Sequence, residues 1–219
     1  SMCRGLKERL ELRSSLEVAM DVQQHMLPSD VPVNPSLDIA AFSTYCDETG
    51  GDYYDFPEVA NVEQVEDGSV LIAIGDVTGH GIAAALIMAS ARAALRTRLR
   101  QGGTLGEVLG DVNDVLVADT PDGKFMTFMS ILVSADGSSF RWAGAGHDPP
   151  LLFNSNTRNF SEPNGGHIPL GIMCDQVFDE YESLLGPPGS ILLTGTDGIW
   201  ETANPEKELY GKDRLRSVI

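Results

Sequence analysis

The sequence predicts an α+β domain in which two β-sheets form the core and α-helices pack outside them. Two mid-chain segments have helical character, and short strand-like segments both precede and follow them. This order of elements is typical of a layered core with helices on the outside. At 219 residues, with 42% hydrophobic and 21% charged residues, the chain has an ordinary globular composition and can bury one large core.

The first predicted element is a helix from about Leu6 to Met26, which ends before Pro28. Its apolar positions recur in alternating steps of four and three, which is a weak heptad pattern. The positions are Leu12, Leu16, Ala19, Gln23 and Met26, and Gln23 is the polar exception. Two interpretations remain open. The helix either lies on its own domain, or it is a linker that follows an upstream sensory domain and forms a homodimer.

Strand character begins at Leu37–Phe42, continues through 48–56, and returns in the apolar run Val70–Ile74. A helix is expected over Ile82–Arg100, and its first ten residues are almost all apolar, so this half should be buried. Three arginines lie four residues apart on the later half. They could bind phosphate, but a solvated helix face is the favoured interpretation. They are Arg92, Arg96 and Arg100.

A second helix should begin after Thr104, a good N-cap residue, and end near Asp119. The remainder is rich in strand-like segments. Asp136-Gly137 between two of them is a hairpin signal. The predicted strands are Phe125–Val133, Ser139–Gly144, Leu151–Phe153, Arg158–Phe160, Asp179–Leu185 and Ser190–Thr194. A short helix-like segment then runs from Thr196 to Glu201.

The net charge excludes some classes of binding partner, and the cysteine pattern favours one type of cellular compartment. The chain has 15 basic and 32 acidic residues, a net charge of −17, which argues against nucleic acid and anionic membrane surfaces as partners. Three widely spaced cysteines in no CxxC pattern favour a reducing compartment, which we expect to be the cytoplasm. No apolar run is long enough to cross a bilayer.

Three aspartates occur in similar glycine-containing turns: Asp52, Asp76 and Asp197. Asp76 and Asp197 each end an apolar strand, Val70–Ile74 and Ile191–Leu193. If these strands are neighbours in one sheet, their carboxylates converge, and such close like charges require cations. Oxygen ligands suit Mg²⁺ or Mn²⁺, and two such ions can activate a water molecule against phosphorus. A single aspartate in such a turn would more simply cap a helix or bond its own backbone, but three in matching contexts favour a metal site.

Five segments carry a recognisable pattern in a fixed order: Gly50–Phe56, Gly75–Ala84, Ala145–Leu152, Pro169–Ile172 and Thr196–Glu201. They closely resemble motifs of the SpoIIE/RsbU-like bacterial phosphatases, a branch of the metal-dependent PPM-type serine/threonine phosphatases. The resemblance extends from about Ala19 to the end of the chain and includes Val22–Pro28.

The resemblance implies a β-sandwich flanked by helices, in four layers α-β-β-α, with a two-metal site at one end. Residues 1–28 would form a linker helix. Residues 29–219 would form the phosphatase domain without its last strand, which either lies beyond this sequence or is missing from the protein. Asp76 would be the catalytic centre and bridge two Mn²⁺ or Mg²⁺ ions. Asp52 and the backbone carbonyl of Val77 would bind one ion, and Asp197 the other. Asp55 would have a structural role.

By the same resemblance, the domain would remove phosphate from phosphoserine or phosphothreonine on a regulatory protein. Family members often act on antagonists of anti-sigma factors, and they are usually the output domain behind a sensory or receiver domain. The alternative is a pseudo-phosphatase that only binds its partner. This alternative rests on the absence from this sequence of a further metal-binding aspartate, which the family usually supplies in an Asp-Asp-x-Thr-like segment near its C-terminus.

Several other conspicuous residues are expected to be structural. His80 lies four residues after Asp76, whereas the general-acid histidine of the wider family lies two residues after the bridging aspartate. His80 and His147 are therefore interpreted as turn histidines bonded to the backbone. Cys46 and Cys174 are expected to pack in the interior. The aromatic residues expected in the core or at the rim of the site are Tyr53, Tyr54 and Trp200.

Overall fold

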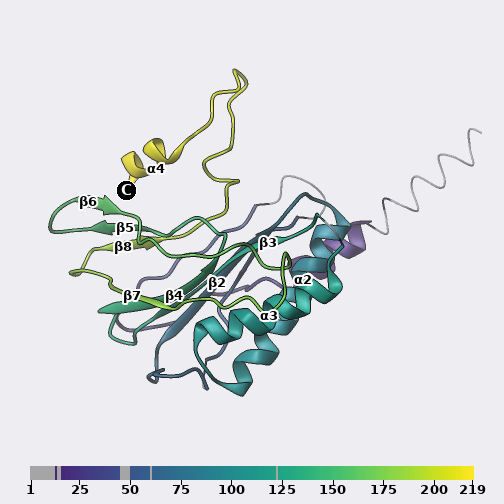
Figure 1. Cartoon of the computed structure of the whole chain (residues 1–219). Coiled ribbons are helices and arrows are strands. Elements are labelled where there is room, and N and C mark those ends of the chain that lie inside the picture. Colours follow the sequence, from purple (N-terminus) through teal and green to yellow (C-terminus); the bar gives the residue numbers. More distant parts are fainter. Residues whose placement is uncertain (1–12, 14–15, 45–49, 60, 122) are drawn as a thin grey trace, which may run out of the picture.

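Two antiparallel β-sheets stack face to face in the structure, a computed structural model that describes residues 13, 16–44, 50–59, 61–121 and 123–219. The larger sheet has the strand order β1-β2-β3-β4-β7, and the smaller has the order β6-β5-β8 (Figure 1). The strands are β1 (Tyr53–Asp55), β2 (Val70–Val77), β3 (Met126–Val133), β4 (Ser139–Ala145), β5 (Leu151–Asn154), β6 (Asn159–Ser161), β7 (Tyr181–Leu184) and β8 (Ile191–Leu193).

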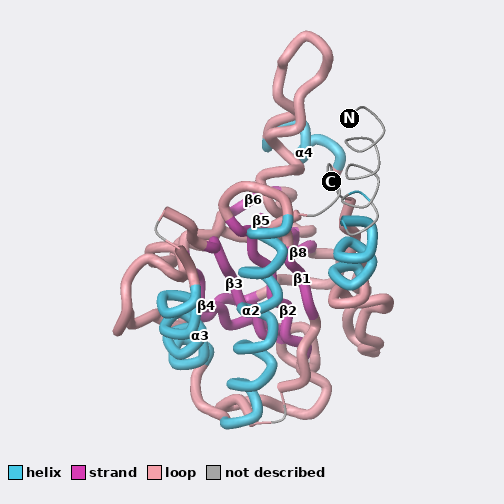
Figure 2. Tube along the Cα trace, turned by 90° about the vertical axis from the view of Figure 1, so that its right-hand side faces the viewer, coloured by secondary structure: helices cyan, strands magenta, loops and turns pink. Residues whose placement is uncertain are grey.

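Two helices cover the outer face of the larger sheet (Figure 2). They are α2 (Ile82–Arg98), which continues into a 3₁₀ turn at Leu99–Gln101, and α3 (Leu105–Asp119). The Thr104 hydroxyl accepts a hydrogen bond from the backbone N–H of Glu107, whose carboxylate bonds the N–H of Thr104 in return. This capping box explains why α3 begins where the sequence predicts.

The central strands are buried on both faces, which explains their nearly continuous apolar sequences. One core lies between the helices and the larger sheet and contains Leu71, Phe128 and Leu109. A second core lies between the two sheets, where Ile131 and Trp142 pack with Leu152 of the smaller sheet. The two-sheet core with helices outside, expected from the sequence, is therefore confirmed.

A fourth layer is sparse within the described residues. The short helix α4 (Lys212–Val218) lies on the outer side of the smaller sheet, where Leu215 lines a small cavity with Leu151 and Leu193. Near the other end of the chain, residues 16–24 are helical, and the rest of the predicted 6–26 helix up to residue 12 falls outside the described residues. No helix in the described ranges has the length and apolar character needed to span a membrane.

Three local predictions are wrong. Residues 38–42 form no strand, and Phe42 is 89% exposed, because a turn held by the Asn34 side chain directs this segment over the surface. The first half of α2 is buried on one face only, so Ile82 and Leu86 are exposed. The segment Thr196–Glu201 is a single turn closed by backbone bonds instead of a helix.

Candidate metal centre

Asp76 lies near the end of β2, half-buried, at the edge where the two sheets meet the turn into α2. On one side β2 pairs with β3, where Thr127 stands opposite Asp76. On the other side it pairs with β1, where Tyr53 stands opposite Gly75. The sequence prediction that a carboxylate ends this buried strand is confirmed.

Asp52 comes directly before β1, and the strand register brings it beside Asp76. Because Tyr53 pairs with Gly75 in an antiparallel ladder, the next position outward places Asp52 opposite Asp76. The backbone N–H of Val77 donates to the carbonyl of Gly51 at 3.3 Å, which extends this pairing beyond the strand. Directly opposed residues of an antiparallel pair have their side chains on the same face, with Cβ atoms about 5 Å apart.

Asp197 reaches the same edge from the other sheet. It follows β8 in the turn after Gly195 and is exposed. The assumption that its strand neighbours the Asp76 strand is wrong, since β2 and β8 belong to different sheets. The carboxylates nevertheless converge because the sheets are stacked, and Thr196 forms a side-chain hydrogen bond to Asp52.

The electrostatics show how closely these acids interact. Burial raises the pKa of Asp76 to about 7, and the negative charges of Asp52 and Asp197 add to the shift against a hydrogen bond from the Val77 backbone. Burial also raises the pKa of Asp52, where the bond from Thr196 opposes the shift and Asp197 adds to it. A cation placed among the three carboxylates would relieve both effects.

The space beside Asp76 fits a metal ligand set that includes a backbone oxygen. A Cβ atom on Gly51 would lie 2.5 Å from the carbonyl oxygen of Val77 and 3.1 Å from Oδ1 of Asp76. Only glycine therefore leaves these two oxygens accessible together. In the described part of the chain, no three His, Cys, Asp or Glu side chains stand close enough to enclose an ion by themselves. Backbone oxygen and water would complete the coordination, as is usual for Mg²⁺.

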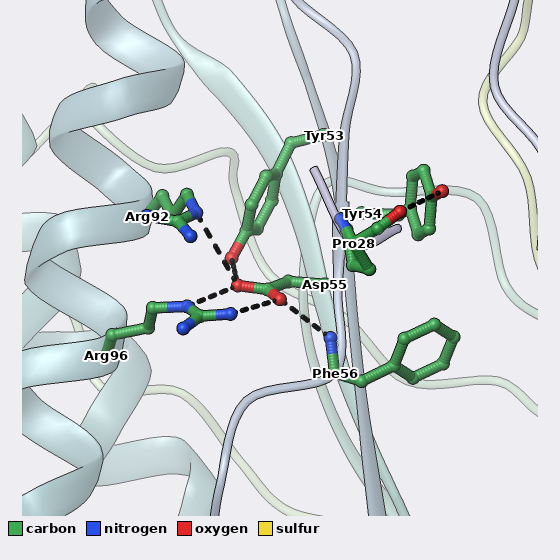
Figure 3. A network of polar contacts seen from close by, with 7 residues as sticks. All are labelled: Pro28, Tyr53, Tyr54, Asp55, Phe56, Arg92 and Arg96. Atoms are coloured by element: carbon green, nitrogen blue, oxygen red, sulfur yellow. Dashed lines mark hydrogen bonds and ion pairs between the residues drawn. The ribbon is translucent and has the colours of Figure 1, made fainter. Parts of the chain in front are cut away.

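Asp55 is fully buried and forms the centre of a separate ionic network between β1 and α2 (Figure 3). Arg96 binds both of its carboxylate oxygens at 2.7 Å, and Arg92 lies 3.8 Å away. The Tyr53 hydroxyl and the Phe56 backbone N–H each donate to it at 2.9 Å. With four hydrogen bonds and the Arg92 guanidinium nearby, Asp55 has the structural role expected for it and is not available to a metal.

This network corrects the interpretation of the three arginines predicted on one helix, of which Arg92 and Arg96 lie on α2 and Arg100 lies in the 3₁₀ turn that follows. Arg100 is exposed, as a solvated face requires. Arg92 and Arg96 instead point to Asp55 and hold the helix against β1. No local sequence signal could have found this contact, because Asp55 and Arg96 are 41 positions apart.

The histidines, cysteines and aromatic residues that the sequence predicts to be structural differ in how far they are buried. The ring of His147 is buried and bonded to a backbone carbonyl, as expected, while His80 lies exposed in the turn before α2. Cys174 is exposed, so its assignment to the interior is wrong, and Cys46 lies outside the described residues. The aromatic residues take core or rim positions: Tyr53 is buried, and Tyr54 and Trp200 are half-buried.

Sequence reasoning missed several residues that support the site. Thr196 bonds Asp52, Thr127 bonds the ring of His147, and Gly51 provides the space beside Asp76. The Lys124 ammonium group donates to the carbonyl of Thr78 at 2.9 Å and so holds the turn after Asp76. The adjacent glycines at 50 and 51 were the one available signal, since paired glycines indicate a close backbone approach.

The chain is similar in sequence to a family of known bacterial proteins. A model of the stage II sporulation protein E (SpoIIE) family matches residues 66–219. The chain is 31% identical over 198 residues to the phosphoserine phosphatase RsbU of Bacillus subtilis, covering 90% of this chain and 56% of that protein. It is 24% identical over 212 residues to the phosphoserine phosphatase RsbP of the same organism, covering 95% of this chain and 50% of that protein. The chain thus spans about half the length of these curated relatives.

Solved structures show the same fold. The SiaA-PP2C domain of Pseudomonas aeruginosa superimposes with a TM-score of 0.72 at 20% identity, covering 96% of this chain and 82% of that one. The RsbU and RsbW domains of Rv1364c from Mycobacterium tuberculosis superimpose with a TM-score of 0.62 at 27% identity, covering 80% of this chain and 46% of that one.

Proposed function

This chain belongs to the SpoIIE family of PPM-type serine/threonine phosphatase domains, and from this we propose that it hydrolyses phosphoserine or phosphothreonine esters with Mn²⁺ or Mg²⁺. The observation that carries the proposal is the convergence of three carboxylates from two sheets at one edge. Burial, with the repulsion from Asp52 and Asp197 added to it, raises the pKa of Asp76 to about 7. Holding these ionised carboxylates close together costs free energy when no cation lies between them, and the same arrangement is suited to binding a divalent cation.

Each residue of the site has a distinct role in this proposal. Asp76, between Asp52 and Asp197, would be the catalytic residue and would bridge two metal positions, and the carbonyl of Val77 would complete the position beside Asp52. The hydrogen bond from Thr196 holds the Asp52 carboxylate in place. A pair of divalent ions would supply an activated water nucleophile and neutralise charge on the phosphoryl group.

The proposed substrate is a phosphorylated regulatory protein of the anti-sigma antagonist type. Two relatives are named phosphoserine phosphatases, and one structural neighbour combines an RsbU domain with an RsbW domain. Since the chain spans about half of its curated relatives, we propose that it serves as the output domain (29–219) of a longer regulator. The helix of residues 1–28 would link it to a sensory or receiver domain and could pair with a second copy. The proposed setting is the cytoplasm, which the cysteine pattern supports.

The proposal is tested by phosphate release from a phosphoserine peptide. We expect turnover that requires added Mn²⁺ or Mg²⁺, disappears with chelator, and is lost in Asp76→Asn. Asp38→Asn is the matched control, because it removes an exposed carboxylate outside the site. Metal-independent turnover, or full activity of Asp76→Asn, would overturn the proposal.

A second candidate function is a pseudo-phosphatase that binds its partner without turnover. It is favoured by the exposure of Asp197 and by the absence, among the described residues, of a three-side-chain metal cluster. The two functions are separated by assaying a longer version of the protein that continues past residue 219 in millimolar Mn²⁺. Efficient turnover excludes the pseudo-phosphatase, and binding of a phosphorylated partner without phosphate release supports it.

A further inference from the structure

His147 joins the two sheets at the edge that carries the three carboxylates. It lies in the connection between β4 of the larger sheet and β5 of the smaller, and its residue is only 9% exposed. Its Nε2 lies 3.1 Å from the carbonyl oxygen of Gly195 in the smaller sheet's turn. Its Nδ1 lies 3.0 Å from the Thr127 hydroxyl on β3 of the larger sheet. Both ring nitrogens are therefore occupied, one toward each sheet.

The contacts define which ring nitrogen carries the proton. A carbonyl oxygen can only accept, so Nε2–H of His147 donates to Gly195. Burial lowers the pKa of His147, which keeps the ring neutral. Nδ1 is then an acceptor, and the Thr127 hydroxyl donates to it. The imidazole thus links the two sheets, donating from Nε2 and accepting at Nδ1. Neither ring nitrogen is left for proton transfer to a substrate.

Each hydrogen-bond partner of the His147 ring lies next to a carboxylate residue of the site. Thr127 stands opposite Asp76 in the β2–β3 ladder. Gly195 precedes Asp197 by two residues, and the intervening Thr196 bonds Asp52. The turn is also tightly packed, because a Cβ on Gly195 would meet Ile199 Cδ1 at 2.4 Å.

We propose that His147 is a positioning residue that fixes the Asp197 turn against the Asp76 strand and so sets the spacing at which the carboxylates bind metal. The inference rests on the proposed metal-dependent function of this site. The main alternative is that His147 only stabilises the fold, as any buried residue with two hydrogen bonds would. Groups that orient metal ligands typically affect metal affinity by about 10- to 100-fold when removed, whereas purely structural groups do not.

The test measures Mn²⁺ affinity directly, from the electron paramagnetic resonance signal of free Mn²⁺, without reference to turnover. We expect His147→Ala to weaken Mn²⁺ binding at least tenfold. His147→Gln should recover part of the affinity, because its amide offers both a donor and an acceptor. Thr127→Val removes the 3.0 Å bond to Nδ1, together with a longer 3.5 Å contact to the Asp76 carbonyl, while keeping the β-branched shape, and should weaken binding in the same direction. These two variants keep the test decisive if His147→Ala fails to fold.

Asn113→Ala is the matched structural control. Asn113 is 1% exposed and also makes two bridging bonds, to the carbonyl of Met173 and from the N–H of Gly171, but it lies between α3 and a loop. We expect it to lower thermal stability and leave Mn²⁺ affinity unchanged. If His147→Ala and Thr127→Val bind Mn²⁺ like the wild type, the positioning role is wrong. If His147→Ala and Thr127→Val bind Mn²⁺ more weakly than the wild type, but the wild type itself releases no phosphate, the positioning role stands and the phosphatase function fails.

Discussion

Replacing Asp76 with asparagine should make the metal-free protein more stable. Asparagine keeps an oxygen for the hydrogen bond from Val77 but carries no charge to repel Asp52 and Asp197. At pH 8 the wild-type carboxylate is ionised in both the folded and the unfolded chain. The full free-energy cost of burying this charge beside two others therefore lowers the stability of the folded protein. The variant removes this penalty and should unfold at a higher temperature in the presence of chelator.

The size of the effect follows from the pKa of Asp76, which rises from 3.8 to about 7 on folding. At about 1.4 kcal/mol per pKa unit, the unscreened penalty is about 4 kcal/mol. Because Asp76 is half-buried, solvent screening reduces it to about 1–2 kcal/mol. For a domain of this size, that corresponds to an increase in Tm of about 3–6 °C.

The sign of the pH dependence provides the check. Between pH 3.8 and 7 the folded protein binds more protons at Asp76 than the unfolded chain, so stability falls as pH rises through this range. The advantage of Asp76→Asn should therefore be smaller at pH 5 than at pH 8. Thermal unfolding in chelator at pH 8 and pH 5, with Asp38→Asn as the control for net charge, measures this. A variant that is less stable than the wild type, or an advantage equal at both pH values, would refute the reasoning.

Two further substitutions test the surroundings of the site. Arg96→Met leaves the buried Asp55 carboxylate without its main partner and should cost about 3 kcal/mol in a denaturant titration, because an unpaired buried charge is strongly destabilising. Arg100→Met, at an exposed position in the 3₁₀ turn that follows α2, should change stability by less than about 0.5 kcal/mol, and equal losses would contradict this role. Gly51→Ala places a Cβ 2.5 Å from a backbone carbonyl of the neighbouring strand and should abolish the rise in Tm on adding Mn²⁺, whereas Gly166→Ala, with nothing closer than 4.0 Å, should keep it. A Gly51→Ala protein with an unchanged Mn²⁺ response would exclude the proposed metal position.

Much of the fold was predictable because its signals are local. The apolar run at Val70–Ile74 is buried on both faces, and the cap at Thr104 is formed by residues three positions apart. The prediction of a strand at Leu37–Phe42 is wrong because only the composition of the segment suits a strand. No neighbouring strand pairs with residues 38–42. Strand formation depends on such partners, which the segment's own sequence does not contain.

The sequence singles out the candidate metal ligands but does not predict how they come together. Asp52, Asp76 and Asp197 are recognisable from the glycine-rich turns around them, yet their convergence depends on the stacking of two sheets. The same limit applies to His147, whose two partners come from different sheets. Local patterns identify residues of chemical interest, whereas the pairing of distant residues is determined by tertiary structure.

The most direct test of the metal centre is the anomalous X-ray scattering of Mn²⁺ in crystals of this protein. We expect anomalous peaks among the carboxylates of Asp52, Asp76 and Asp197, with one peak in contact with the carbonyl oxygen of Val77. Crystals of Asp76→Asn grown in the same Mn²⁺ concentration should lack them. Wild-type crystals in which Mn²⁺ binds elsewhere, and not at Asp76, would contradict the account.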